Sequence, residues 1–317
     1  MIKDDSYIKY CLLNELNLKR INLPKDPIKT ELHKNEAQFS FCNGVLTLER
    51  RNESLDNLRL NFFTSFTSQV VNHFSLKDLN FKFIVNFNDG PENDALETRL
   101  CFARPKDSPH ICIPDSHLSR TASICNSLSS IDKPFEEKIN KASFFGSDTG
   151  RKDKDGSVQR VNFCKKYKNS ENVIAKITNF IEQPFDQTIY SSPASIVDQL
   201  NYKYILNING NTTSWERLIW AMKSNSFCLF VRPPQYQNEI SWYYHMFDLC
   251  QSFIYVDEDS IENFIEWASF HQNDIDYLKQ NQKNMANTLA KIEVHAYYLS
   301  YILLNYNHIY NESSKLS

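Results

Sequence analysis

The feature that most constrains the fold of this chain is an alternation of short apolar runs with amphipathic segments after residue 140. Runs that fit strands occupy four segments, at 142–146, 203–209, 226–231 and 252–256. Patterns that fit helices lie beside them, at about 158–168, 171–182, 214–223, 240–249 and 260–270, before a long helical region at 273–310. Because strands that alternate with helices form βαβ units, this order predicts an α/β fold with a parallel sheet.

The first part of the chain has a different pattern. The run "AQFSFCNGVLTLER" alternates around Asn43-Gly44, which predicts a β-hairpin because both turn residues tolerate positive φ. The other expected elements are a helical start within 1–34, a helix at 54–75 and strands at 81–87, 98–103 and 110–114.

A change of composition across 129–157, to a charged loop with Gly, Ser and Thr, places a domain boundary near residue 140. We expect domains at 1–140 and 141–285, the size that 317 residues favour. A helical segment at 286–317 is expected to pack back on the first domain.

Composition excludes several classes of protein. A net charge of −3 argues against a nucleic-acid binder, which needs a basic excess. No apolar run is long enough to span a membrane, and the N-terminus lacks a signal-peptide pattern. The eight Cys are scattered without a C-x-x-C pair, which indicates free thiols in a reducing, cytoplasmic compartment. The eight His form no metal-binding pattern, so neither a metal nor another cofactor is expected.

The stretch "YKYILNINGNTTSWERL", 202–218, leaves two interpretations open. A strand ends at Gly210, and Thr213 and Glu216 have the spacing of a capping box at the start of a helix. The same helix start would direct its N–H groups at the end of the strand, where α/β sheets bind phosphates, and Arg217 would add charge.

Two further stretches are equally open. In "FFGSDTGRKDKDGSVQR", 144–160, the turn after the strand either faces a phosphate or is a solvated loop. In "FIVNFNDGPEN", Asp89 is either a general base at a strand end or the cap of a turn, and Asp115 is a weaker candidate of the same kind.

Two motifs favour ordinary structural roles. Asp257 and Asp259 resemble a D-x-D metal motif, but Asp259 and Glu262 have capping-box spacing, which we favour. The C-terminal segment from Asn287 to Tyr310 shows apolar residues at helical spacing, which favours a packing helix over a membrane anchor.

Taken in order, these stretches resemble glycosyltransferase family 90, which includes the Rumi-type protein O-glucosyltransferases, fungal capsule-associated xylosyltransferases and bacterial lipopolysaccharide-modifying enzymes. The similarity rests on "FFGSDTG", on "LNYKYILNINGNTTSWERLIWAMKSNSFCLF" and on "NEISWYYHMFDLCQSFIYVDEDSIENFIEW". Upstream, "FIVNFNDGP" is similar to the family's strand that ends in Asn-x-x-Asp-x-Pro. The clearest part runs from Phe144 to about Met285.

The resemblance implies a GT-B-like fold with two facing Rossmann-like domains, the acceptor on the first and a UDP-sugar on the second. It implies an inverting, metal-independent transfer of glucose, xylose or a similar sugar to a surface glycan such as lipopolysaccharide core or capsule. Peripheral membrane association at the inner face would suit a glycolipid acceptor. Alternatives on the same scaffold are a sugar-phosphate transferase and a non-catalytic glycan-binding protein.

The resemblance also implies roles for individual residues. Asp89 corresponds to the catalytic base. The donor-binding set comprises Gly146, Ser147, Thr149, Arg160, Gly210, Thr213, Ser214, Arg217 and Glu239. Glu216 stands where Rumi-like members have an arginine, and Arg217 follows one place later, so the sequence leaves open which residue meets the diphosphate.

Overall fold

The computed structural model describes residues 6–16, 21, 23, 31–90, 97–235, 237–250 and 254–315. The chain forms two compact units, of which the first comprises 1–116, 239–246 and 291–317 and the second comprises 117–238 and 247–290. The first crossing between them falls after Ser116, upstream of the boundary expected near residue 140. Residues 291–317 belong to the first unit.

The sheet of the first unit is mixed. Its strands, in the spatial order β2-β1-β3-β4-β6, are Val45–Arg51, Glu36–Cys42, Phe81–Asn86, Leu100–Cys101 and Ile111–Cys112. β1 pairs antiparallel with β2 and β3, whereas β4 pairs parallel with β3 and β6. A Rossmann-like domain has a mostly parallel sheet, so the expectation of one here is wrong for the half that contains β1 and β2.

The predicted hairpin is confirmed. Asn43 and Gly44 join β1 to β2 with φ values of 50° and 74°, and positive angles at both central residues are what a two-residue type I′ turn requires. A Cβ on Gly44 would lie 2.5 Å from the carbonyl oxygen of Leu76, so the position also excludes a side chain.

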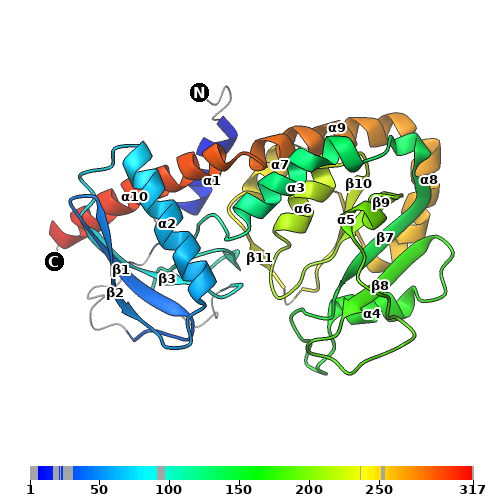
Figure 1. The fold of residues 1–317 in the computed structure, drawn as a ribbon, viewed down its shortest axis with the longest axis horizontal. Coiled ribbons are helices and arrows are strands. Elements are labelled where there is room, and N and C mark those ends of the chain that lie inside the picture. The colour runs from blue at the N-terminus through cyan, green and yellow to red at the C-terminus, as the bar shows by residue number, and fades with distance from the viewer. Residues whose placement is uncertain are drawn as a thin grey trace. The chain divides into compact units, whose positions relative to one another are not determined.

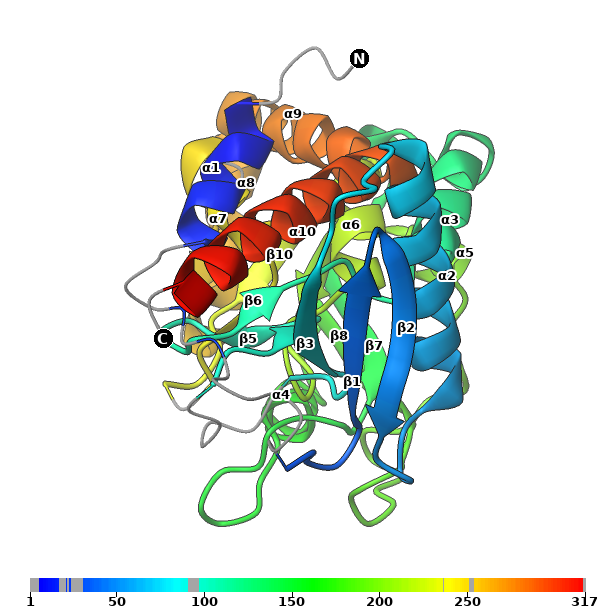
Figure 2. The same cartoon turned by 90° about the vertical axis from the view of Figure 1, so that its left-hand side faces the viewer.

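Two helices distant in sequence cover one face of this sheet: α2 (Asn57–His73) and α10 (Ile292–Lys315). Phe39 and Phe83 are paired neighbours on β1 and β3. Phe63 of α2 lies 5.1 Å from Phe39, between ring centroids, and Tyr306 of α10 lies 6.2 Å from Phe83. Figure 2 shows both helices beside these strands. This aromatic cluster is the core of the first unit.

A buried carboxylate attaches α1 (Ser6–Glu15) to the same unit. Glu15 is fully buried, and its oxygens accept hydrogen bonds from Arg104 Nη2 at 2.8 Å and from the backbone N–H of Cys112 at 2.9 Å. His245 Nε2 lies 3.0 Å from the same carboxylate. Arg104 belongs to β5 (Arg104–Pro105), which pairs with β11 (Glu239–Ile240), and His245 belongs to α7 (Tyr244–Cys250).

The second unit is built on a five-stranded sheet in which all neighbours are parallel. Its strands, in the spatial order β12-β10-β9-β7-β8, are Tyr255–Val256, Phe227–Val231, Tyr202–Asn207, Ile139–Ser147 and Val173–Asn179. The short elements are α5 (Ile196–Gln199) and two 3₁₀ turns, Phe135–Glu137 and Glu258–Ser260. The expected parallel sheet of this part of the chain is therefore present (Figure 1).

Helices cover both faces of this sheet. Phe144, Leu206 and Leu229 share a core cluster with residues of α4 (Gln159–Lys166) and α8 (Ile261–Phe270), such as Phe163 and Ile265. On the opposite face α3 (Leu118–Ile131), α6 (Glu216–Lys223) and α9 (Gln272–Leu289) lie side by side (Figure 1).

Two of the expected elements differ from the structure. The segment 171–182, expected as a helix, contains strand β8, in which Val173, Ala175 and Ile177 are buried and the residues between them are not. That burial has the period of two that only a strand produces. The helical region expected at 273–310 is two helices, α9 and α10, separated at Ala290 and Lys291.

Candidate functional site

The strand order of the second unit defines one special edge. The first strand in sequence, β7, lies between the second, β8, and the third, β9. The helix after β7 covers one face of the sheet, whereas the helix after β9 lies with α3 and α9 on the other. Because the two connections turn away in opposite directions, a crevice opens between them, and open α/β sheets bind ligands at such a point. The carboxyl ends of β7 and β9 are therefore the candidate site.

β7 and β9 separate before they end. Their pairing stops at Ser143 and Ile205, although β7 continues to Ser147 along β8. Two arginines contact backbone carbonyls on the two sides of this gap. Arg217 donates a hydrogen bond to the carbonyl of Phe145 in β7, and Arg160 donates to the carbonyl that follows β9, that of Ile208. Two positive charges therefore lie at this edge of the sheet.

Arg160, in the first turn of α4, connects both candidate loops. Its Nη2 lies 3.0 Å from the carbonyl oxygen of Ile208, and its Nη1 lies 3.1 Å from Thr149 Oγ1. Thr149 in turn lies 2.9 Å from the hydroxyl of Ser147. A Cβ on Gly210 would come within 3.0 Å of Arg160 Nη2, so this glycine leaves room for the guanidinium. The predicted residues Ser147, Thr149, Arg160 and Gly210 thus form one connected group.

Buried polar side chains form hydrogen bonds with the backbone of the loop that follows β9. Thr213 and Ser214 are buried, and the Ser214 hydroxyl donates to the Ile208 carbonyl at 3.3 Å. Gln237, which is 4% exposed, donates from Nε2 to the carbonyl of Gly210 at 2.8 Å. Sequence reasoning missed Gln237, because a single glutamine in a Pro-rich connection gives no signal of a long-range contact.

The predicted capping box does not match the start of α6. The helix begins at Glu216, with Trp215 at the cap position and without a side-chain cap from that residue. Thr213 therefore lies two residues before the cap, and Glu216 is the first helical residue instead of the third. Glu216 forms an ion pair with Arg120 of α3, at 3.0 Å.

The side chain of Arg217, and not that of Glu216, points to the carboxyl end of β7. Its guanidinium lies over the Phe144 ring at 5.3 Å from the centroid, and that of Arg160 lies 5.7 Å from the same centroid. Arg217 Nη1 is buried and has no hydrogen-bond partner among the residues that the structure describes. Burial lowers the pKa of Arg217 to about 10, so the group is still charged at neutral pH.

Asp148 fixes the neighbouring loop and was also missed from the sequence. It is fully buried, and its carboxylate accepts backbone N–H bonds from Ile181 at 2.8 Å, Glu182 at 2.9 Å and Gln183 at 2.5 Å. Three such bonds satisfy a buried carboxylate, which therefore supports the loop that follows β8. A Cβ on Gly146 would lie 2.8 Å from the Phe144 ring, so this glycine leaves room for that ring.

Three sequence candidates belong to the first unit. Asp89, after β3, accepts from Arg59 Nη2 at 2.7 Å, and its side chain is 35% exposed. Asp115 is buried and follows β6. Glu239, expected among the donor-binding residues, is buried in β11, which pairs with β5 of the same unit.

Both aspartates of the acidic motif after β12 form ion pairs with basic side chains. Asp257 pairs with Arg232 at 2.6 Å, and Asp259 pairs with Lys166. The favoured cap is wrong, because α8 begins at Ile261 with Ser260 at its cap position, and Asp259 lies in the preceding 3₁₀ turn. Among the described residues, His, Cys, Asp and Glu form no group of three that could hold a metal ion.

The second unit therefore presents two arginines, a hydroxyl pair and a glycine loop at the switch point of a parallel sheet. A family model described as Glycosyl transferase family 90 matches residues 112–315, more than half of the chain. The chain belongs to glycosyltransferase family 90. It is an enzyme that transfers a sugar from a donor to a glycan acceptor. The comparison with curated proteins gives no match.

The family match includes every residue of the switch point named above and begins downstream of Asp89. The base assignment of Asp89 consequently stays a prediction. Within the described part of this glycosyltransferase, no helix is both long and apolar enough to cross a membrane.

Proposed function

We propose that this glycosyltransferase uses a UDP-sugar, inverts the anomeric carbon and needs no metal ion. Its acceptor is a hydroxyl of a surface glycan such as lipopolysaccharide core or capsule, and the enzyme associates peripherally with the inner face of the membrane. The two units form a GT-B-like fold in this proposal. The donor diphosphate is held by Arg160 and Arg217 with the loops of Ser147 and Gly210.

The observation that carries the proposal is the convergence of Arg160 and Arg217 on the gap between β7 and β9. A leaving nucleoside diphosphate gains negative charge as the glycosidic bond to the sugar breaks, and fixed cations with N–H donors stabilise that charge without a metal. α4 supports this, because its first turn holds no acidic residue and Val158 at its cap makes no side-chain cap bond. The N–H groups and positive dipole end of α4 add to the arginine charge.

Asp89 is the proposed base. An inverting transfer requires one group that removes the proton of the acceptor hydroxyl while that oxygen attacks the anomeric carbon. The ion pair with Arg59 orients the carboxylate, and the 35% exposure of its side chain leaves it accessible. Arg59 is itself fixed by a hydrogen bond of 2.6 Å from Nη1 to the carbonyl of Phe87.

The donor part of the proposal is tested by calorimetry with UDP and by turnover with a panel of UDP-sugars in EDTA. Arg160→Gln is expected to weaken UDP binding about tenfold or more, the value of a lost charged hydrogen bond. The exposed Lys154→Gln is the control and is expected to bind UDP like the unmodified enzyme. Unchanged UDP affinity in Arg160→Gln, or turnover that requires an added metal, contradicts the proposal. The product mass separates transfer of a sugar from transfer of a sugar phosphate.

The base is tested by Asp89→Asn, which keeps an acceptor for Arg59. Turnover is expected to fall by about 10²-fold or more, the usual contribution of a general base, while UDP affinity stays the same. Asp78→Asn, an exposed carboxylate of the same unit, serves as the matched control. Wild-type turnover in Asp89→Asn would remove Asp89 from the mechanism.

A further inference from the structure

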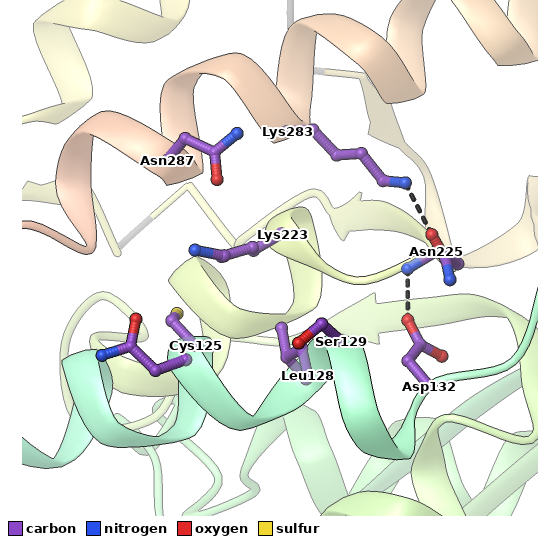
Figure 3. A pocket seen from close by; sticks show the side chains of 9 residues that line it. Cys125, Leu128, Ser129, Asp132, Lys223, Asn225, Lys283 and Asn287 are labelled. Carbon is purple, nitrogen blue, oxygen red and sulfur yellow. Dashed lines mark hydrogen bonds between the residues drawn. The ribbon is translucent and has the colours of Figure 1, made fainter.

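A polar cavity away from the switch point lies in the second unit, between helices α3, α6 and α9 (Figure 3). Its volume is about 360 Å³, within the range of small-molecule sites. It is lined by Cys125, Asn126, Leu128, Ser129, Asp132, Lys223, Asn225, Lys283 and Asn287. None of these residues belongs to the switch point, since Lys223 and Asn225 lie at the opposite end of α6 from Glu216 and Arg217.

The cavity carries net positive charge, because its one carboxylate, that of Asp132, already forms an ion pair with a lysine outside the lining. Asp132 Oδ1 pairs with the buried ammonium of Lys138, which also donates to the carbonyl of Leu200 at 2.6 Å. Asp132 Oδ2 accepts the backbone N–H of Asn225. The carboxylate is therefore neutralised by Lys138 and fixed by a backbone bond.

Two further ammonium groups line the cavity, and neither forms an ion pair within 4 Å among the described residues. Lys283 donates to Asn225 Oδ1 at 2.6 Å and makes no ion pair there, and Lys223 makes none either. Burial lowers the pKa of Lys283, and the charge of neighbouring Lys279 lowers it further, against the opposing charges of Asp132 and Glu136. Lys279 itself pairs with Asp276 at 2.9 Å. The partial negative charge at the carboxyl end of α6 offsets part of the charge of Lys223. The charge of Lys283 remains, so the cavity keeps an excess of positive charge.

The other lining groups suit hydroxyls. Asn126, Ser129 and Asn287 present amides and a hydroxyl that both donate and accept, and Figure 3 shows Lys223 and Asn287 on two sides of one space. Cys125 is not a reactive group here, because burial raises the pKa of its thiol to about 11. The site thus combines ammonium groups for an anion with amides for a polyol.

We infer that this cavity binds the phosphate monoester of a monosaccharide, separately from the nucleotide donor. The phosphate meets Lys223 on the side of Asn287, Lys283 adds its charge from the side of Asn225, and the sugar hydroxyls meet the Asn and Ser side chains. A ligand held here contacts three helices of the second unit and so stabilises their packing against one another.

The test is calorimetry on the full chain saturated with UDP, with inorganic phosphate, glucose, and the 6-phosphates of glucose, mannose and galactose as probes. At least one hexose phosphate is expected to bind more tightly than phosphate or glucose alone. Lys223→Gln with Lys283→Gln is expected to weaken that binding tenfold or more, and Lys77→Gln, an exposed lysine of the first unit, leaves it unchanged.

Turnover with the donor gives an independent readout that the double variant has folded, because neither lysine belongs to the donor site. Arg160→Gln separates the two sites, since it is expected to weaken UDP binding without changing hexose phosphate binding when UDP is omitted. The inference is overturned if no hexose phosphate binds, if the double variant binds as well as the unmodified chain, or if Arg160→Gln alone abolishes the binding.

Discussion

Arg217 and Glu216 are adjacent in sequence, but the first turn of α6 sends their side chains to different partners. Glu216 pairs with Arg120 of α3, whereas Arg217 bonds to the Phe145 carbonyl of β7. Consecutive helical residues differ by about 100° in direction, which is enough to place one on a neighbouring helix and the other at the strand end. A one-residue shift in sequence therefore decides which charge reaches the switch point.

This geometry predicts unequal effects of two neighbouring substitutions. Arg217→Met is expected to weaken UDP binding about tenfold or more, because it removes a charged donor, and Glu216→Gln is expected to change it less than twofold. Calorimetry with UDP measures both, and urea unfolding checks that the variants are folded. Equal losses for the two variants, or a larger loss for Glu216→Gln, would show that Arg217 does not meet the diphosphate.

A pair of glycines gives a second prediction at this scale. Gly210→Ala places a methyl group 3.0 Å from Arg160 Nη2, so the guanidinium must shift, and UDP affinity is expected to drop several-fold. Gly156→Ala meets nothing within 4 Å but sits at φ +81°, so it costs about 1 kcal/mol of stability and leaves UDP affinity unchanged. Calorimetry and urea unfolding of both variants separate the two effects. Unchanged UDP affinity in Gly210→Ala, or a loss of UDP affinity in Gly156→Ala, would contradict this role of Gly210.

Among the elements, β10 depends on a helix to complete one of its edges. β12 pairs only with Phe230 and Val231. Gln282 of α9, fully buried, bonds instead to both backbone groups of Cys228, at 3.0 Å to the N–H and 2.8 Å to the carbonyl. One amide side chain thus replaces a missing stretch of strand.

Gln282→Leu is expected to lower the free energy of unfolding by about 2 kcal/mol or more, because two buried backbone groups lose their partners. Gln280→Leu, an exposed position on the same helix, is the matched control and is expected to change stability by about 0.5 kcal/mol or less. Urea unfolding measures both. A similar loss in the two variants would mean that Gln282 acts only through helix propensity.

At the scale of the whole molecule, stability at alkaline pH depends on buried thiols. Burial raises the pKa of Cys164 to about 12, against the opposing charges of Lys176 and Arg160, whereas an unfolded chain loses this proton near pH 8.5. Between these values the unfolded state binds fewer protons than the folded state, so stability falls as the pH rises. Below about pH 8.5 the contribution is fully present.

The difference in unfolding free energy between the unmodified chain and Cys164→Ala is therefore expected to shrink by up to about 1.4 kcal/mol per pH unit above pH 9. Urea unfolding of both proteins at pH 8, 9, 10 and 10.5 provides the measurement. A cavity created by the alanine changes this difference in unfolding free energy by the same amount at every pH, so it does not change the slope against pH. A difference that is constant over this range would show that the thiol titrates normally in the fold.

How far the sequence predicts this molecule depends on the range of the interactions involved. The Asn43-Gly44 turn and the parallel sheet that contains β7, β9 and β10 follow from local signals, namely turn residues and strand-helix alternation. The helix predicted at 171–182 is wrong, because Val173–Asn179 form β8, a strand that pairs parallel with β7.

The residues missed by sequence reasoning, Asp148 and Gln237, act on backbone groups more than 25 positions away, and no local pattern encodes such a contact. Glu15 is of the same kind, since its partners Arg104 and His245 come from distant elements.

Apolar alternation along the chain indicated the α/β class, and the motifs of the loops and strands carried the resemblance to glycosyltransferase family 90, because both are written in consecutive residues. Tertiary structure alone decided the strand order β8-β7-β9, which opens the gap where Arg160 and Arg217 converge. It also decided that Arg217, and not Glu216, faces that gap. The neighbours of a strand and the partner of a side chain depend on how segments distant in sequence pack together. That packing results from many small interactions along the entire chain, so no local pattern encodes it.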